Sequence, residues 1–212
     1  MKYILLTFLL LTSLAQANLG TYKNGKFIYP DTDKPYTGNL DVINNDWGKD
    51  AVEFNKDYVD GVLHGAEKVF YRSGKLKSVG CFNKGLIDGT TTLYYEDGSV
   101  QAEVNFSNGI REGRAVSYYP DGTKQSEQFY VTDKLYGLSR QWYDTGSLMI
   151  SRDYSKGLLH GEVTTYYESG KVFEVTKFNY GTPKFKRTYN EDGSLAKEEG
   201  FLNKQIIDSI IS

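Results

Sequence analysis

The sequence has few of the residues that define several structural classes. Its 212 residues include one cysteine and four prolines, which excludes disulfide-stapled, collagen-like and proline-rich linker architectures. Positive charge is not in excess, because 25 basic residues are set against 27 acidic ones. No long-range field therefore attracts nucleic acid or anionic lipid. The lone thiol, Cys81, is predicted to be a small, half-buried apolar side chain.

The sequence also lacks the hydropathy of a polytopic membrane protein. Mean hydropathy is -0.51, while 15% of the residues are aromatic, which is too large a share for a disordered chain. These values indicate a folded, water-facing protein. Glycine is over-represented, since its 22 residues are about 10% of the chain against an average of about 7%, and this excess needs a structural cause.

The first 17 residues, MKYILLTFLLLTSLAQA, have the pattern of a bacterial-type secretory signal peptide. Lys2 precedes an apolar run, and Ala15-Gln16-Ala17 fits a small-x-small cleavage site. The alternative is an uncleaved membrane anchor, but the run is shorter than the roughly 20 residues that span a bilayer. We therefore expect export to the periplasm, the cell surface or the medium, and a mature chain that begins at Asn18.

After residue 60 the sequence repeats with a period of 24 residues, so the glycine excess reflects turns multiplied by copy number. Glycine recurs in three columns, where a column is the set of residues at one position of successive repeats. The columns are Gly65, Gly89, Gly113, Gly137 and Gly161; Gly74, Gly98, Gly122, Gly146 and Gly170, continued one residue early by Gly193; and Gly61, Gly85, Gly109, Gly157 and Gly181, with Asp133 replacing one member. Two aromatic columns keep the same spacing: Tyr71, Tyr95, Tyr119, Tyr143 and Tyr167, and Phe82, Phe106, Tyr130, Tyr154 and Phe178.

Each repeat is predicted to be a β-hairpin. The β-branched and aromatic run from Gly89 to Tyr95 indicates a strand. Asp97-Gly98 then suits a two-residue hairpin loop, and a second strand of about eight residues follows. A lone hairpin is marginal in water, so each one must be stabilised by its neighbours. The predicted fold is therefore all-β, an elongated, single-layer array of stacked antiparallel hairpins.

The loop length determines which residues share a face of this sheet. With two-residue loops, Tyr71, Leu76 and Phe82 lie on one face, which is predicted to be the core. The same holds for Tyr95, Val100 and Phe106, and for Tyr143, Leu148 and Tyr154. A loop with an odd number of residues would exchange the two faces.

These units resemble the MORN repeat family. The resemblance rests on stretches such as Gly65-Ala-Glu-Lys-Val-Phe-Tyr-Arg-Ser-Gly-Lys-Leu76, followed by Phe82-Asn-Lys-Gly85 and Asp88-Gly89, and it takes the form of a bacterial variant with a Tyr-Tyr-x-x-Gly core. It covers about residues 61–193, as five complete units and a shortened sixth. One departure is Phe185, which stands where a glycine is expected.

Segment boundaries follow from where the period starts and stops. We predict a signal peptide at residues 1–17, an entry segment at 18–35, a repeat array at 36–200 whose leading unit at 36–60 is diverged, and a C-terminal cap at 201–212. The cap is predicted to be a short helix that Asn203 starts and that presents one apolar face, and one more edge strand is the alternative. The apolar residues are Ile206, Ile207, Ile210 and Ile211.

A third aromatic column is the candidate binding site. Strand alternation places it on the face opposite Tyr71, where its expected cross-strand neighbours Lys77, Gln101 and Gln125 are polar. Tyr and Trp suit recognition because they offer rigid contact area with a polar handle. The alternative is that a one-layer sheet needs aromatic side chains on both faces for rigidity. We name this column the aromatic stripe: Phe70, Tyr94, Tyr118, Trp142, Tyr166 and Tyr189.

The sequence does not bring potential catalytic residues together. His64 and His160 occupy the same repeat position four units apart, which corresponds to about 38 Å across the strands. The segment from Gly20 to Lys26 resembles a phosphate-binding loop, but Phe27 stands where a magnesium-binding Ser or Thr is needed. We predict no enzymatic activity, no cofactor, and no catalytic or metal-binding residues, with an enzyme of unrecognised type as an alternative.

The resemblance implies an interaction surface rather than catalysis. The predicted function is an exported, non-enzymatic binding or scaffold protein for a protein, glycan or envelope component, with no nucleic-acid partner. MORN repeats also occur beside the catalytic domain of phosphatidylinositol phosphate kinases, so one alternative is a lipid-headgroup-binding array that carries an inherited kinase label. Loss of Lys2 changes the formal net charge from -2 to -3, which disfavours anionic bilayers. Similar bacterial proteins are labelled antitoxins, a second alternative that the export signal disfavours.

Overall fold

The computed structural model describes residues 20–29 and 32–201. The predicted signal peptide, the start at Asn18 and the predicted C-terminal helix lie outside these residues. Phe201 is the one described residue of the tail, and its backbone N–H donates to the carbonyl of Lys184 (2.9 Å). The described chain is all-β and contains no helix, as the sequence predicts.

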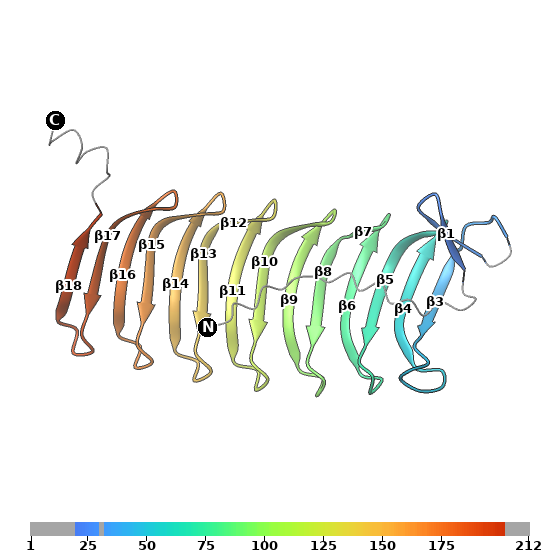
Figure 1. Ribbon diagram of the computed structural model, residues 1–212, viewed down its shortest axis with the longest axis horizontal. Helices are drawn as coiled ribbons and strands as arrows, with labels where there is room; N and C mark the ends of the chain where they lie inside the picture. The colour runs from blue at the N-terminus through green and yellow to red at the C-terminus, as the bar shows by residue number, and fades with distance from the viewer. Residues whose placement is uncertain (1–19, 30–31, 202–212) are drawn as a thin grey trace.

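Two sheets make up the structure. The strands β1 (Thr21–Lys23) and β2 (Lys26–Ile28) form a small hairpin, and all other strands form one antiparallel sheet. In Figure 1 this sheet is a single row of curved strands, ordered along the row as they are in the sequence. At about 4.8 Å per strand the row is about 60 Å long. The array of stacked hairpins is therefore confirmed.

The long sheet has sixteen strands. Two of them are short and lie beside the main row: β7 (Leu86–Ile87) next to β6, and β12 (Lys134–Leu135) next to β11. The main row runs through β3 (Gly38–Ile43), β4 (Val52–Val59), β5 (Val62–Phe70), β6 (Leu76–Asn83), β8 (Gly89–Tyr94), β9 (Val100–Ser107), β10 (Ile110–Tyr118), β11 (Lys124–Val131), β13 (Gly137–Trp142), β14 (Leu148–Ser155), β15 (Leu158–Tyr166), β16 (Val172–Asn179), β17 (Thr182–Tyr189) and β18 (Leu195–Gly200).

Two kinds of turn close the hairpins, at opposite ends of the strands. At one end a three-residue loop follows Tyr71, whose N–H donates to the carbonyl of Lys75 (2.8 Å), and only Gly74 has a positive φ. At the other end Lys84 and Gly85 have φ values of 49° and 82°, the paired left-handed conformations of a two-residue turn. The prediction of two-residue loops at Ser73-Gly74 and its equivalents is therefore wrong, because Ser73 does not adopt the left-handed conformation that such a loop requires.

A bulge after each three-residue turn compensates for the extra loop residue. Phe70 pairs with Leu76, but Val69 pairs with Ser78, so the extra residue is Lys77. The loop and the bulge each add one residue, and Tyr71 and Phe82 consequently share a face, as predicted.

The bulge nevertheless exchanges the faces of the two residues beside it. Leu76 lies on the face of Phe70, whereas the ammonium of Lys77 lies 5.6 Å from the centre of the Tyr71 ring. The prediction that Leu76 shares the face of Tyr71 is therefore wrong. Val100 and Leu148 likewise pair with members of the aromatic stripe.

We name the two faces of the sheet the tyrosine face, which carries Tyr71 and Phe82, and the stripe face, which carries the aromatic stripe. Small residues on the tyrosine face, such as Thr91, Ala102 and Ser139, are at least 96% buried although no second layer covers them in the described chain. Aromatic columns flank these small residues along the strands of the same face. The core therefore lies on the tyrosine face, as predicted, although Val116 on the stripe face is also buried.

The N-terminal hairpin closes one end of this core. Phe27 of β2 is fully buried, and its ring centre lies 5.2 Å from that of Tyr58. Its N–H donates to the carbonyl of Gly61 (2.8 Å), and its carbonyl accepts from the N–H of Tyr36 (2.9 Å). The segment that resembles a phosphate-binding loop is thus a hairpin whose turn precedes a core residue.

The diverged leading unit is a hairpin as well, made of β3 and β4. Its loop is closed by the N–H of Asn44, which donates to the carbonyl of Ala51 (2.8 Å), where other units join Tyr71 to Lys75. This loop is three residues longer than its equivalents, which explains why Gly38 and Gly65 are 27 residues apart.

Candidate binding surface

The tyrosine column holds the backbone of the aromatic stripe in place. Each tyrosine hydroxyl reaches across to the next hairpin and donates to a stripe carbonyl. Burial raises the pKa of the Tyr71 and Tyr95 hydroxyls, so these groups remain protonated donors. The five bonds are Tyr71 to Tyr94 (2.7 Å), Tyr95 to Tyr118 (2.7 Å), Tyr119 to Trp142 (2.9 Å), Tyr143 to Tyr166 (3.0 Å) and Tyr167 to Tyr189 (2.9 Å).

The side chains of the aromatic stripe lie on the opposite face and are all partly buried. The expectation that they sit opposite Lys77, Gln101 and Gln125 is wrong, because the bulge moves those polar residues to the tyrosine face. Most of the actual cross-strand partners are aliphatic, so the stripe rings pack against apolar side chains and retain an exposed part. These partners are Leu76, Val100, Lys124, Leu148, Val172 and Leu195.

Trp142 has a distinct environment within the stripe. The ammonium of Lys124 lies 5.1 Å from its ring centre, a favourable position for a cation over an indole. Lys124 also replaces an aliphatic residue at its repeat position. The middle of the stripe is therefore more polar than its ends.

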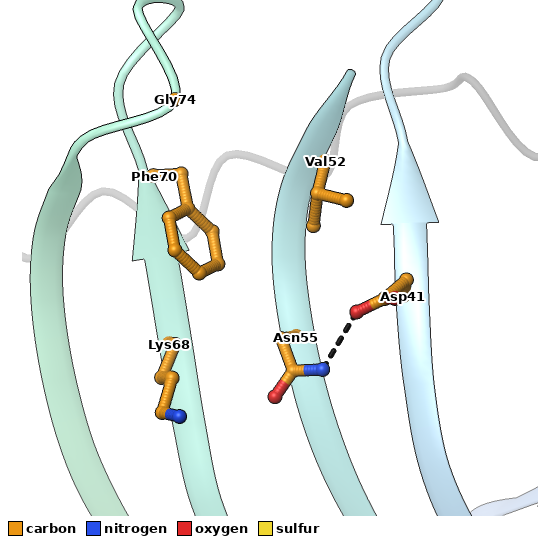
Figure 2. A pocket seen from close by; sticks show the side chains of 6 residues that line it. All are labelled: Asp41, Val52, Asn55, Lys68, Phe70 and Gly74. Atoms are coloured by element: carbon orange, nitrogen blue, oxygen red, sulfur yellow. Dashed lines mark hydrogen bonds between the residues drawn. The ribbon is translucent and has the colours of Figure 1, made fainter. Parts of the chain in front are cut away.

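A hollow of about 440 Å³ lies beside the first member of the stripe. Figure 2 shows Phe70 and Lys68 on one strand, Val52 and Asn55 on the next, and Asp41 on the third. An Asn55 amide N–H donates to the carboxylate of Asp41 (2.6 Å). The hollow thus combines a ring, an ammonium, an amide and a carboxylate, which are groups that can orient a polar ligand.

Sequence reasoning found Phe70 but missed its polar neighbours. Asp41 pairs with Asn55, and Asn55 pairs with Lys68. The 24-residue period misses Asp41, because Asp41 lies before the longer loop of the leading unit, whereas Asn55 lies after that loop. The signal that could have found this row is strand alternation. Counting every second residue back from the glycine of the two-residue turn, such as Gly61, gives the residues that share a face.

A second hollow, of about 400 Å³, lies on the same face between β13 and β16. Its lining is apolar at Leu138, acidic at Asp153 and Glu162, and basic at Lys177. Both hollows therefore open on the stripe face.

The histidines are held apart, as expected. His64 lies on β5 and His160 on β15, eight steps apart in the strand order. The Nδ1 of His64 accepts from the backbone N–H of Lys84 (3.4 Å), and the ring of His160 stacks on Tyr180 (4.2 Å between ring centres). Neither has a neighbouring nucleophile or carboxylate placed as a catalytic partner in the part of the chain that the structure describes.

Other candidate chemistry can be placed for the described residues only. Across residues 20–29 and 32–201, no three His, Cys, Asp or Glu side chains are grouped to hold a metal ion. The same residues include no helix long and apolar enough to cross a bilayer. Cys81 is exposed, so the prediction of a half-buried thiol is wrong. Its side chain lies on the stripe face opposite Ala66, and no second layer of the described residues covers that face.

Comparison with known families agrees with the repeat geometry. A family model described as the MORN repeat variant matches residues 63–84, 87–108, 111–132 and 159–180. Each match spans the strand before a three-residue turn and the strand after it. The matched segments leave out residues 133–158. No curated protein matches the chain.

Proposed function

Because the chain belongs to the MORN repeat family, whose repeats are generally non-catalytic binding or scaffold modules, we propose that this protein is an exported binding module for a protein or glycan of the cell envelope. The partner lies along the stripe face. The export proposal rests on the sequence of residues 1–17. No step of catalysis is part of the proposal.

One observation carries this proposal. The aromatic stripe and both hollows lie on a single face of a sheet about 60 Å long. The tyrosine hydroxyls hold the stripe backbone at five successive hairpins. A partner would meet a surface that is already ordered, which lowers the entropic cost of binding. An elongated partner would gain contacts from several repeats at once.

Trp142→Ala tests this proposal. We expect the purified variant to lose about 2 kcal/mol of affinity for the partner captured by the wild-type protein from envelope extract, which is about a 30-fold increase in Kd. The thermal midpoint should change little, because Trp142 is only partly buried. Calorimetry with the identified partner measures binding. Export is tested separately by determining the first residue of the protein isolated from the cell envelope: Asn18 supports export with cleavage, and Met1 contradicts cleavage.

The matched control is Phe173→Ala. Phe173 is an aromatic residue that is 40% exposed, but its ring contacts Tyr167 on the tyrosine face (5.1 Å between ring centres). We expect this variant to bind as the wild type does. If Trp142→Ala instead costs about 3 to 5 kcal/mol of stability and leaves affinity unchanged, the stripe is structural and the proposal fails.

A further inference from the structure

Two exposed apolar side chains in the middle of the array stand at repeat positions where most other units have polar or small residues. Phe129 is 45% exposed and Leu138 is 49% exposed. Phe129 replaces residues that are polar or small in every other unit: Asp57, Cys81, Asn105, Asp153 and Lys177. Leu138 replaces Ala66, Thr90, Arg114 and Glu162 of the complete units, and its equivalent in the shortened last unit is Phe185. The fold therefore does not require an apolar side chain at either position.

These two residues lie on the stripe face of neighbouring strands. Glu127 pairs with Arg140 across β11 and β13. Phe129 and Leu138 each lie two residues beyond that pair, on the same face. Tyr136, which is 52% exposed, is adjacent, because its N–H donates to the carbonyl of Phe129 (2.9 Å). Contiguous exposed apolar side chains of this kind mark an interaction site.

Charged residues of opposite sign flank the apolar pair. Arg114 pairs with Phe129 on one side, and Asp153 pairs with Leu138 on the other. One row across β10, β11, β13 and β14 therefore reads basic, apolar, apolar, acidic. The neighbouring row on the same face has the acidic Glu127 and the basic Arg140 at its centre. If either row is laid over a reversed copy of itself, each basic residue faces an acidic one and each apolar residue faces an apolar one.

We propose that the patch of the stripe face around Phe129 and Leu138 is the interface of a homodimer, with a second copy of this chain packed face to face over the junction of β11 and β13. A two-fold axis parallel to the strands reverses the order of each row. It places Phe129 over Leu138 of the second copy, Arg114 over its Asp153, and Glu127 over its Arg140. Such an interface is isologous, since the same patch serves both copies.

The position and the electrostatics of the patch fit this arrangement. β11 and β13 lie near the middle of the strand order, and twisted sheets that pack face to face approach most closely near their crossing point. Arg114 uses its Nε for Glu127 (2.7 Å), which leaves other guanidinium N–H groups for a carboxylate. Asp153 has no ion-pair partner among the described residues, and it lines the second hollow, which has room for an incoming guanidinium.

The first test measures self-association of the purified protein by sedimentation over a concentration series. We expect dimers for the wild type. Phe129→Asn and Leu138→Thr should each weaken dimerisation by about tenfold or more. Both substitutions introduce residues that occupy the same repeat positions in other units, so the hairpins should still form. The control is Leu158→Thr, which alters a residue that is 49% exposed outside the patch and should leave dimerisation unchanged.

Charge reversal tests the symmetry itself. Arg114→Asp and Asp153→Arg should each weaken the dimer, while the double variant should restore it, because each pair joins two copies. A wild type that stays monomeric at its highest soluble concentration overturns the proposal. So does a double variant that associates no better than the single ones, or dimerisation that Phe129→Asn leaves unchanged. Thermal unfolding of every variant separates these outcomes from misfolding. None of them depends on whether the stripe binds an envelope partner.

Discussion

At the scale of single residues, the bond from a tyrosine hydroxyl to the carbonyl of the next hairpin is the most regular interaction in the protein. It recurs at five successive units with lengths from 2.7 to 3.0 Å. Each accepting carbonyl belongs to the last residue of a strand, where the backbone ladder ends. The hydroxyl therefore supplies a partner to a group that would otherwise be left without one at a partly buried site.

Tyr95→Phe should destabilise the protein by about 1 kcal/mol, because the ring stays in place while the carbonyl of Tyr118 loses its donor. Chemical denaturation measures the change. The control is Tyr154→Phe, the same chemical change in a column that already contains Phe82, Phe106 and Phe178. We expect the control to shift stability by less than about 0.5 kcal/mol. Equal effects of the two substitutions would contradict a structural role for the Tyr95 hydroxyl.

At the scale of elements, two-residue turns join successive hairpins, and the turn at Thr132-Asp133 is built differently from the rest. Asp133 adopts a φ of 63° where the other units have glycine. Its carboxylate accepts from the backbone N–H of Arg111 (3.1 Å) and from its Nε (2.7 Å). Arg111 in turn replaces an aliphatic residue and lies 4.2 Å from the centre of the Tyr130 ring. The two substitutions thus form one local unit.

This pair predicts a pH-dependent contribution to stability. The hydrogen bond from Arg111 lowers the pKa of Asp133 below its ordinary range. Because the folded-state pKa is depressed, the stabilisation is present above the unfolded-state pKa of about 3.9 and is lost as the pH falls through the lower folded-state value. Asp133→Asn should therefore be less stable than the wild type by about 0.5 kcal/mol near neutral pH, since the pair is exposed.

Thermal midpoints of wild type and Asp133→Asn, measured between neutral and strongly acidic pH, check this prediction. Asparagine tolerates the left-handed backbone, so the comparison isolates the charge. We expect the gap between the two proteins to close in acid. A gap that stays constant across the titration would show that the carboxylate charge contributes nothing.

At the scale of the whole molecule, each hairpin contacts only its neighbours in one row of strands, so stability should be a sum of local terms. The two ends of the row differ. The β1–β2 hairpin buries Phe27 against Tyr58 and Leu40 at the N-terminal end. At the other end, β18 is almost entirely exposed.

Phe27→Ala should remove about 3 to 5 kcal/mol of local stability, as truncation of a fully buried aromatic does. Amide hydrogen exchange should show lost protection in β1 to β4 and unchanged protection in β14 to β18, because coupling decays along the row. Leu195→Ala, at an apolar residue that is 53% exposed in β18, serves as the control with little effect. Uniform loss of protection along the chain would instead show that the array unfolds as one cooperative unit.

The sequence alone was sufficient for the repeat architecture. The 24-residue period of glycine and aromatic residues predicts hairpins, and no lone hairpin is stable, so an array must follow. The architecture was readable because it depends only on local turn chemistry and a side-chain period of two. Tyr71 and Phe82 share a face, as predicted, only because the extra loop residue and the bulge at Lys77 cancel each other.

Contacts between strands needed the three-dimensional structure, because they depend on the number of residues in every turn and bulge. One extra residue at Lys77 moved Leu76 to the stripe face and removed the predicted polar neighbours of the stripe. A longer loop in the leading unit took Asp41 out of the period and concealed its place beside Asn55 and Lys68. The pairing of neighbouring strands likewise brought Arg114, Phe129, Leu138 and Asp153 into one row. A shift of one residue in any of these strands would have turned its member of the row to the other face.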